Sequence, residues 1–256
     1  MEGVLVDAVI TGPTTPVLTV TLAGGEAVVA ESGELSWLGG DVTLETGRNV
    51  GMSQGGFLKS AKRALGGGTF FMTRYSTTSG GFVAFAAKAP GEIRELMLDS
   101  NHEFVVHRHG FVCCEEGVEL SMHVQQKLGV GIFGGAGFFL QKLSGTGRAY
   151  VELHGQVVSF HLEPGQEMRV HPGHVGLFES TVSLELTTVP GIRNKLFGGD
   201  GLFLARLRGP GEVWLQSITL AGLAHALQPY IVTETAAEGG ALAGGAAILG
   251  SLMKDR

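Results

Sequence analysis

The sequence predicts an all-β fold, and three observations lead to that prediction. Apolar residues alternate at period two over 151–153, 157–162 and 182–186, as in strands that bury one face. Helical periodicity is scarce in the rest of the chain. The 42 glycines among 256 residues exceed the usual share of about 7%. They lie between the apolar runs without a collagen period, so tight turns between short strands account for them.

A repeated pattern indicates that one structural unit is used more than once. Three glycine-rich segments, at 66–71, 134–139 and 198–203, each lead into an apolar run. Counted from the first glycine, a basic residue stands at offset eight and an aromatic residue at offset sixteen. These residues are Arg74, Lys142 and Arg206, followed by Phe82, Tyr150 and Trp214. Regularity of this kind is the sequence signature of internal repeats.

Each repeated pattern predicts a β-hairpin, near residues 66–86, 134–154 and 198–217. Turn residues stand at the centre of two of them, Ser-Gly-Thr-Gly at 144–147 and Arg-Gly-Pro-Gly at 208–211. In this register the basic residue faces the aromatic residue at about 5 Å between Cβ atoms, within reach of a cation–π contact. The same face also carries an apolar residue in each copy, so we expect a neighbour to cover it.

The chain is predicted to form one β domain over residues 1–232, followed by a Gly/Ala-rich tail over 233–256. Within the domain, residues 55–65 predict one short helix, which Gly66 ends, and residues 221–228 predict another.

The tail contains an uncharged stretch of small residues from 239 to 253. It falls short of the roughly 20 apolar residues that span a bilayer. We therefore expect a flexible end, or one that docks on the assembled protein. The alternative is close helix packing through Gly240 and Gly244, at a membrane.

Composition bears on the partners of this chain. The 18 basic residues are scattered, and the formal net charge is -6, which argues against nucleic acid as the main partner. Charged residues make up 16% of the chain, below the roughly 25% usual for soluble domains. A surface with few charges is often covered by a partner, so self-association is expected.

The cysteines and the N-terminus predict a cytoplasmic location. Cys113 and Cys114 are the chain's two cysteines, and neighbours on a strand point to opposite faces. The sequence therefore offers no disulfide framework, which favours a reducing compartment. Residues 1–7 show neither a secretory signal nor an Arg-rich transit pattern.

Seven short motifs stand in a fixed order along the chain. They are Gly55-Gly56-Phe57, Gly67-Gly68-Thr69-Phe70-Phe71, Pro90-Gly91-Glu92-Ile93, Gly134-Gly135-Ala136-Gly137-Phe138-Phe139, Pro164-Gly165, Gly198-Gly199-Asp200-Gly201 and Gly209-Pro210-Gly211-Glu212-Val213-Trp214-Leu215-Gln216. Over most of residues 1–232 this set resembles the altered-inheritance-of-mitochondria protein 24 family.

That resemblance implies a duplicated double-stranded β-helix, a β-sandwich-like fold similar to the tryptophan RNA-binding attenuation protein, assembled as a homotrimer. It implies no catalytic residues and no cofactor, because prokaryotic members of the family lack an assigned activity. The fungal mitochondrial member is tied to inner-membrane organisation. We do not expect that role here, since the chain shows no transit peptide.

His107 and His109, followed by Glu115, are the strongest candidates for a metal site. Cupins use a His-x-His pair and a later Glu, and residues two apart share one face of a strand. However, five residues separate His109 from Glu115, a longer gap than cupins use, and Asn101 stands where cupins have a glycine. We expect no metal site, and we keep a cupin-like metal-dependent enzyme as the alternative.

The remaining motifs favour structural roles. His171 and His174 flank a Pro-Gly turn and are expected to be solvated. Carboxylates follow the two cysteines directly and would raise the thiol pKa, so inert thiols are expected. The Gly-Gly segments lead into strands, whereas a phosphate loop leads into a helix.

The sequence thus predicts a non-enzymatic, trimeric β scaffold with an unidentified protein partner and no catalytic, cofactor-binding or metal residues.

Overall fold

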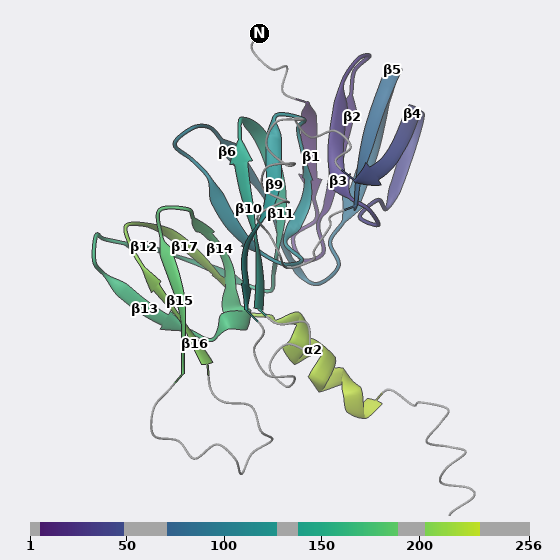
Figure 1. Ribbon diagram of the computed structural model, residues 1–256. Coiled ribbons are helices and arrows are strands. Elements are labelled where there is room, and N and C mark those ends of the chain that lie inside the picture. Colours follow the sequence, from purple (N-terminus) through teal and green to yellow (C-terminus); the bar gives the residue numbers. More distant parts are fainter. Residues whose placement is uncertain (1–5, 49–70, 127–137, 189–202, 231–256) are drawn as a thin grey trace, which may run out of the picture. The chain divides into compact units, whose positions relative to one another are not determined.

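A computed structural model describes residues 6–48, 71–126, 138–188 and 203–230. These residues form mostly β-strands, so the predicted all-β fold is confirmed (Figure 1). The chain divides into two compact parts, Met1–Thr219 and Leu220–Arg256. The second part begins with α2 (Leu220–Leu227) and η3 (Gln228–Tyr230), which confirms the helix predicted over 221–228. The helix predicted over 55–65 and the tail 233–256 lie outside the described residues.

The strands of the first part fall into three consecutive repeats, which follow β1 (Asp7–Thr11). Repeat 1 contains β2 (Val17–Leu22), β3 (Ala27–Glu31), β4 (Trp37–Arg48) and β5 (Phe71–Ala86). Repeat 2 contains β6 (Gly91–Leu98), β7 (Phe104–His107), β8 (Phe111–Cys114), β9 (Val118–Gln126), β10 (Phe138–Gly145) and β11 (Gly147–His154). Repeat 3 contains β12 (Val157–Leu162), β13 (Glu167–Val170), β14 (Val175–Glu179), β15 (Ser183–Thr188), β16 (Phe203–Arg208) and β17 (Gly211–Gln216).

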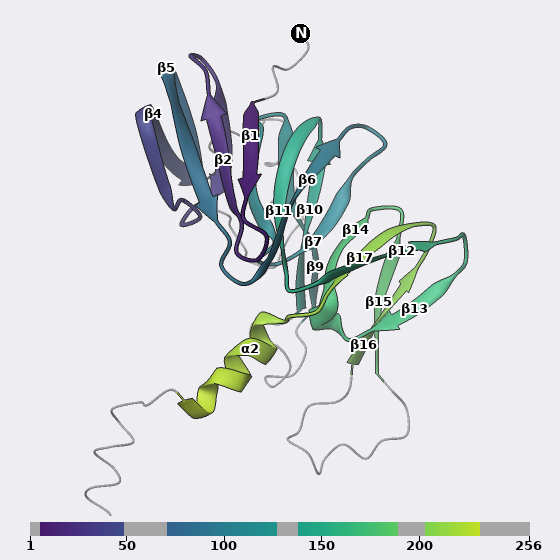
Figure 2. The ribbon, with the colours of Figure 1, turned by 180° about the vertical axis from the view of Figure 1, so that it is seen from behind.

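One pairing pattern serves all three repeats (Figures 1 and 2). In repeat 2, β10 lies between β7 and β9, and β11 lies between β6 and β8. In repeat 3, β16 lies between β13 and β15, and β17 lies between β12 and β14. In repeat 1, the long strands β4 and β5 each take the place of two strands. The first half of β5 pairs with β3, its second half pairs with β2, and β4 pairs along both halves.

The three predicted hairpins are wrong. Arg74 and Phe82 lie on one continuous strand, β5. The two strands of the second predicted hairpin, β10 and β11, belong to different sheets, and so do β16 and β17 of the third. Residues 144–147 and 208–211 are corners, where the chain leaves one sheet and enters the next. Gly145 and Gly147 in the first corner have φ of 98° and 134°, a region that glycine adopts readily.

Strand pairing joins the repeats into continuous sheets. Repeat 1 meets repeat 2 where β3 pairs with β8, through Val29↔Cys114 and its neighbouring pair. Repeat 2 meets repeat 3 where β7 pairs with β14, and this seam continues to Phe104↔Glu179. At each seam, the outer face of the later repeat packs against the core of the repeat before it.

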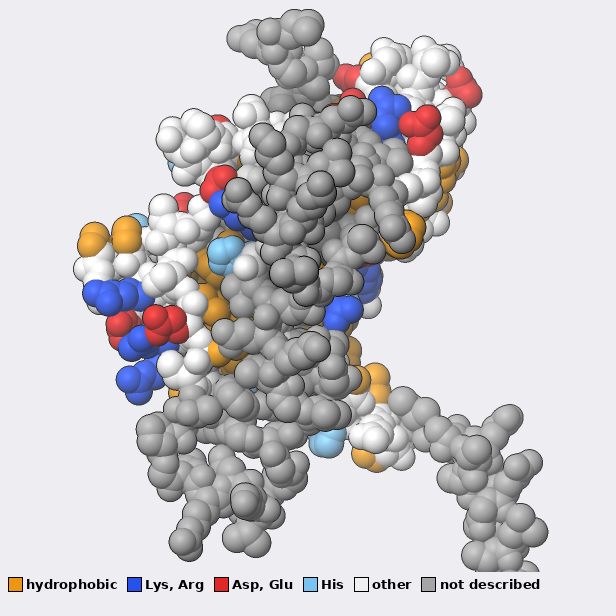
Figure 3. All heavy atoms as spheres, viewed as in Figure 1, with side chains coloured by type: hydrophobic (Ala, Val, Ile, Leu, Met, Phe, Trp, Pro, Cys, Tyr) orange, Lys and Arg blue, Asp and Glu red, His pale blue; other side chains and the backbone are white. Residues whose placement is uncertain are grey.

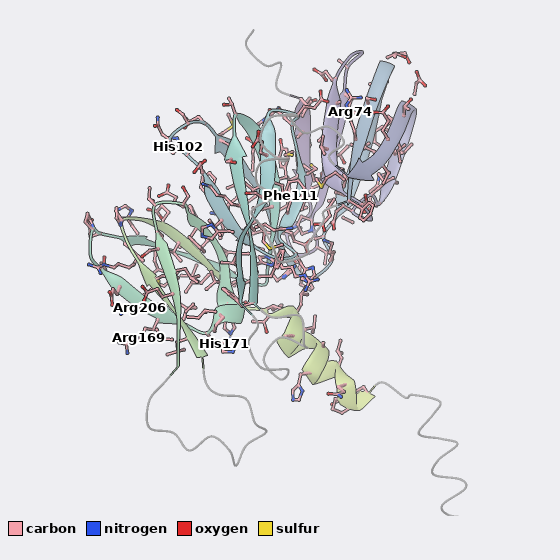
Figure 4. All side chains as sticks on the ribbon, in the orientation of Figure 1. Arg74, His102, Phe111, Arg169, His171 and Arg206 are labelled. Atoms are coloured by element: carbon pink, nitrogen blue, oxygen red, sulfur yellow. The ribbon has the colours of Figure 1, made fainter. Side chains whose placement is uncertain are left out.

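The cores show this arrangement directly. Tyr150 and Cys113 of repeat 2 pack into the apolar core of repeat 1, beside residues of β2, β3 and β5. Leu177 and Trp214 of repeat 3 pack in the same way against the core of repeat 2. Phe111, at the centre of that second core, is fully buried (Figure 4). Repeats 2 and 3 therefore each close the core of the repeat before them.

Candidate functional site

The structure does not bring His107 and His109 together as metal ligands. His107 ends β7, and its Nε2 donates a hydrogen bond of 3.0 Å to the backbone oxygen of Glu152, so that nitrogen has no lone pair for a metal. His109 lies exposed in the turn before β8. Glu115 is held elsewhere, by the backbone and side chain of Arg148. Among the described residues, no group of three or more His, Cys, Asp or Glu side chains suits a metal ion. The geometry gives the cupin alternative no support.

His107, which is half-buried, belongs instead to a polar cluster with the buried side chains of Glu152 and His154. The Glu152 carboxylate accepts hydrogen bonds from the backbone N–H groups of Lys88 and Ala89, at 2.8 and 3.1 Å. Nε2 of His154 lies 3.1 Å from the same oxygen, and the rings of His107 and His154 are 5.1 Å apart. Burial, reinforced by His154, lowers the pKa of His107 to about 3. The cluster ties the end of repeat 1 to β11 of repeat 2, which is a structural role.

The Pro-Gly turn near His171 and His174 is the short 3-10 helix η1 (Pro172–His174). Nδ1 of His171 accepts a hydrogen bond from the Gly173 backbone N–H at 3.3 Å. Nδ1 of His174 donates to the backbone oxygen of Gln216 at 2.8 Å. His171 is exposed, as expected for a turn (Figure 4), whereas His174 is half-buried. Both rings support the local backbone.

Cys113 and Cys114 are fully buried on opposite faces of β8. Cys113 faces the core of repeat 1, and Cys114 faces the core of repeat 2. Burial first, and then the neighbouring Glu115, raises the pKa of the Cys114 thiol. Both cysteines are free thiols, and their burial supports the expectation that they are inert.

The basic residues at offset eight are paired with carboxylates, so the predicted basic–aromatic pairs are wrong. Nε of Arg74 lies 2.7 Å from Glu116, and Nζ of Lys142 lies 2.6 Å from Glu103. Arg206 pairs with Glu185 within the charged surface over β13, β15 and β16 (Figures 3 and 4). An acidic residue on a nearby strand or turn, which the repeat pattern does not contain, supplies each partner.

The aromatic residues at offset sixteen occupy equivalent places with different exposure. Each pairs across the ladder with an equivalent residue: Phe82 with Gly39, Tyr150 with Cys113, and Trp214 with Leu177. Tyr150 is 1% exposed, and its hydroxyl donates to Glu95 at 2.7 Å. Trp214 is partly buried against repeat 2, with the Arg94 guanidinium 5.8 Å from its ring centroid. Phe82 is 37% exposed, because no repeat precedes repeat 1.

An apolar face surrounds Phe82 at this end of the repeat series. Trp37 lies on the same side of the neighbouring strand β4 and is 49% exposed. Val9 of β1 pairs with Thr19 of β2, which pairs in turn with Ala84, two residues after Phe82 on β5. Val9 therefore lies on the same face of the sheet as Phe82, and it is 56% exposed. Val9, Trp37 and Phe82 form what we call the head face.

A second apolar surface lies at the other end, on the core side of repeat 3. Phe160 pairs with Val213, as Leu96 pairs with Ala149 in repeat 2. Leu96 is 5% exposed, because repeat 3 closes the core around it, whereas Phe160 is 42% exposed. Val158, two residues earlier on β12, is 49% exposed. We call Val158 and Phe160 the tail face.

Sequence reasoning missed one structural set, the carboxylates that accept hydrogen bonds beside the corners. Glu115 accepts a hydrogen bond from the backbone N–H of Arg148 at 2.9 Å, and Glu179 accepts one from that of Glu212 at 3.0 Å. In repeat 1, Asp41 accepts from the hydroxyls of Thr78 and Ser79. The separation of 33 residues is the same in repeats 2 and 3, which was the signal available in the sequence.

Comparison with known proteins identifies the family. The family model described as mitochondrial biogenesis AIM24 matches residues 8–218. The chain belongs to the AIM24 family. An uncharacterised relative, M6_Spy0233 of Streptococcus pyogenes serotype M6, is 25% identical over 223 residues, which cover 86% of this chain and 88% of the relative.

A crystal structure shows that this AIM24 fold recurs. SPYM3_0169 from Streptococcus pyogenes has a TM-score of 0.69 to this chain at 23% identity. The match covers 88% of this chain and 100% of the crystallised chain. In the described part of the AIM24 chain, no helix combines the length and hydropathy of a membrane span.

Proposed function

We propose that this AIM24 chain is a non-enzymatic scaffold, and that it assembles head to tail as a homotrimer in the cytoplasm. One observation carries the proposal. The outer faces of repeats 2 and 3 close the cores of the repeats before them, whereas the equivalent face of repeat 1 leaves Phe82 and Trp37 exposed. An exposed apolar surface of this kind is typical of a protein interface.

The tail face is an uncovered core side against which the head face of a second copy could pack. Trp214 packs against the core of repeat 2, and the equivalent residue of a second copy is Phe82. In repeat 3 the position equivalent to buried Leu96 is exposed Phe160. Packing Phe82 of one copy against Phe160 of the next would therefore continue the repeat series from one chain into another.

Unpaired strand edges support the same direction of assembly. Within the described residues, β13 pairs with β16 alone and β4 pairs with β5 alone. The two internal seams are formed by β3 with β8 and by β7 with β14. In the repeat pattern, β13 is equivalent to β3 and β7, and the first half of β4 is equivalent to β8 and β14. Pairing β13 with β4 of the next copy would form a third seam and cover two exposed edges.

A head-to-tail interface uses two different surfaces, so it closes into a ring or grows into a filament. The family resemblance implies three copies, and three copies would place nine repeats in one ring. Four of the side chains singled out in the sequence, His107, Glu115, His171 and His174, make hydrogen bonds that hold the backbone, which supports a scaffold. The free, buried cysteines favour a reducing compartment such as the cytoplasm. What the ring holds is a further protein, as yet unidentified.

The mass of the assembly in solution tests this proposal. The native chain is expected at three times the chain mass by light scattering after size exclusion. Phe82→Glu places a carboxylate in the interface and is expected to give monomers. Met97→Glu is the matched control, because Met97 is 54% exposed but lies in repeat 2, away from the head and tail faces. A monomeric native chain, or equal loss of mass in both variants, would refute the assembly.

A further inference from the structure

The outer edge of β12 is unpaired among the described residues, and the repeats show what occupies such an edge elsewhere. β2, β6 and β12 open repeats 1, 2 and 3, and each pairs on one side with the strand that ends its repeat. On its other side, β2 also pairs with β1, antiparallel, from Asp7↔Thr21 to Thr11↔Val17 (Figure 2). No described strand pairs with the outer edge of β6 or of β12. Such an edge presents unpaired backbone N–H and C=O groups.

The side chains of β12 match those of β2 rather than those of β6. The cross-strand partners of the offset-sixteen aromatics align Val-Thr-Leu at 20–22 with Arg-Glu-Leu at 94–96 and Val-Ser-Phe at 158–160. β2 and β12 thus share an apolar, a hydroxyl and an apolar residue, whereas β6 carries two charges. Charged side chains protect an edge strand against further pairing. In the described part of the chain, β2 is covered by β1 and β6 is charged, whereas β12 has neither protection at these positions.

The chain's own β1 shows how an added strand buries this pattern. Val20 and Leu22 of β2 are fully buried. Ala8 pairs with Val20, and both Ala8 and the preceding Val6 pack into the core of repeat 1. The equivalent residues of β12 are the two residues of the tail face, and both are exposed. An added strand with apolar residues at the positions of Val6 and Ala8 would cover them.

An added strand and a following repeat are compatible. The core of repeat 1 contains Val6, which precedes β1, and also Tyr150 and Cys113 of repeat 2. By the same geometry, a strand at the edge of β12 and the head face of a second copy would each cover part of the tail face.

We propose that the outer edge of β12 binds an extended segment of a partner polypeptide as an added antiparallel strand. The segment carries apolar side chains at two alternate positions, which pack on Val158 and Phe160 while its backbone pairs with β12. The inference rests on the scaffold function proposed above, because it states how the unidentified protein docks. It does not require the trimer, since a single chain supplies the whole edge.

Fluorescence anisotropy of a labelled peptide tests the proposal on the full-length protein. The peptide has the sequence of residues 6–12, Val-Asp-Ala-Val-Ile-Thr-Gly, because β1 covers the equivalent edge in repeat 1. We expect saturable binding with one site per chain. Two further peptides carry backbone N-methyl groups, one at residues 7 and 9 and the other at residues 8 and 10. Alternate N–H groups of an added strand face its neighbour, so one of these peptides should lose binding and the other should keep it.

The double variant Val158→Arg/Ser159→Glu gives β12 the two charges that β6 carries at the equivalent positions. It should weaken peptide binding by about tenfold or more, because charges on an edge strand oppose further pairing. Met97→Glu is the matched control, since it adds a charge at an exposed position of β6. It should leave binding unchanged within about twofold, as expected for a surface substitution away from the site.

Absence of saturable binding, or an equal effect of the two N-methylation patterns, would overturn the proposal. Undiminished binding by the double variant would place the peptide elsewhere, such as at β2 in exchange for β1, and would overturn it too. Light scattering of the same samples reports the assembly separately. A monomeric native chain that binds the peptide would refute the trimer and support the docking edge. Far-ultraviolet circular dichroism of each variant must match that of the native protein.

Discussion

In repeats 2 and 3, one carboxylate accepts a hydrogen bond from the backbone just after the corner, and so links strands of two different sheets. Glu179 ends β14, and its side chain accepts a hydrogen bond from the backbone N–H of Glu212, at the start of β17. Glu115 does the same for Arg148 and also receives the arginine side chain. A charged acceptor on a partly buried N–H is costly to remove, because the donor is left without a partner.

Glu179→Ala is therefore expected to lower the free energy of unfolding by about 1–3 kcal/mol. Urea denaturation followed by tryptophan fluorescence measures this value. The control Glu163→Ala changes an exposed turn residue and should stay within about 0.5 kcal/mol of the native protein. Equal effects of the two variants would show that the corner bond contributes nothing.

The lowered pKa of His107 predicts acid sensitivity of folding. Its pKa is lowered from 6.5 to about 3 in the folded chain by burial and by His154. Between pH 6.5 and pH 3 the unfolded chain therefore binds a proton at this residue that the folded chain does not bind. Stability contributed by neutral His107 is present above about pH 6.5 and is lost as the pH falls towards 3. His107→Gln keeps a donor for the Glu152 oxygen and removes the titration. The loss of stability between pH 7 and pH 5, measured by denaturation, should be smaller in His107→Gln than in the native protein. The same loss in both proteins would contradict this assignment.

At the level of elements, α2 belongs to the second of the two compact parts of the chain. No side chain of α2 is buried among the described residues, and the chain divides between Thr219 and Leu220. Truncation after Thr219 should therefore leave the melting temperature of the β part unchanged within about 2 °C, a shift that corresponds to less than 1 kcal/mol for a domain of this size. Trimer mass should also persist, because the head and tail faces lie before residue 219. Loss of the trimer on truncation would assign the assembly to the C-terminal part.

Strands were the elements that the sequence predicted well, because alternation depends only on which face each residue buries. The corners were misread for a physical reason. Gly145, Gly147 and Pro210 end a strand whether the chain turns back on its partner or crosses into another sheet. Local turn chemistry does not distinguish the two outcomes, since the partner strands come from distant residues, such as β7 for β10 and β13 for β16.

The candidate site was predicted in part. The offset-sixteen aromatics were expected on a face that a neighbour covers, and Tyr150 and Trp214 are covered by the preceding repeat of the same chain. Their expected cation partners were wrong, because Arg74 and Lys142 reach carboxylates that no local pattern places beside them. The difference between the two seams was beyond sequence reasoning, since it lies in a ladder between distant strands that ends one pair earlier between repeats 1 and 2 than between repeats 2 and 3.

For the whole molecule, the central feature is a series of three repeats that, among the described residues, is open at both ends. Inside the chain, each junction buries an aromatic or apolar outer face against the preceding core. At one end Phe82, which is equivalent to Tyr150 and Trp214, is 37% exposed, and at the other end Phe160, which is equivalent to buried Leu96, is 42% exposed. In the proposed trimer, another copy supplies the neighbour that each end lacks.

Mixing two assembly-defective variants tests this claim most directly. Phe82→Glu disables the head face and Phe160→Glu disables the tail face, so each variant alone should be a monomer by native mass spectrometry. A head-to-tail interface uses one face from each copy, so an equimolar mixture should form heterodimers through the intact tail of one variant and the intact head of the other. Homodimers of either variant should be absent. A mixture that stays monomeric although both variants are folded, or variants that remain trimeric alone, would contradict the account.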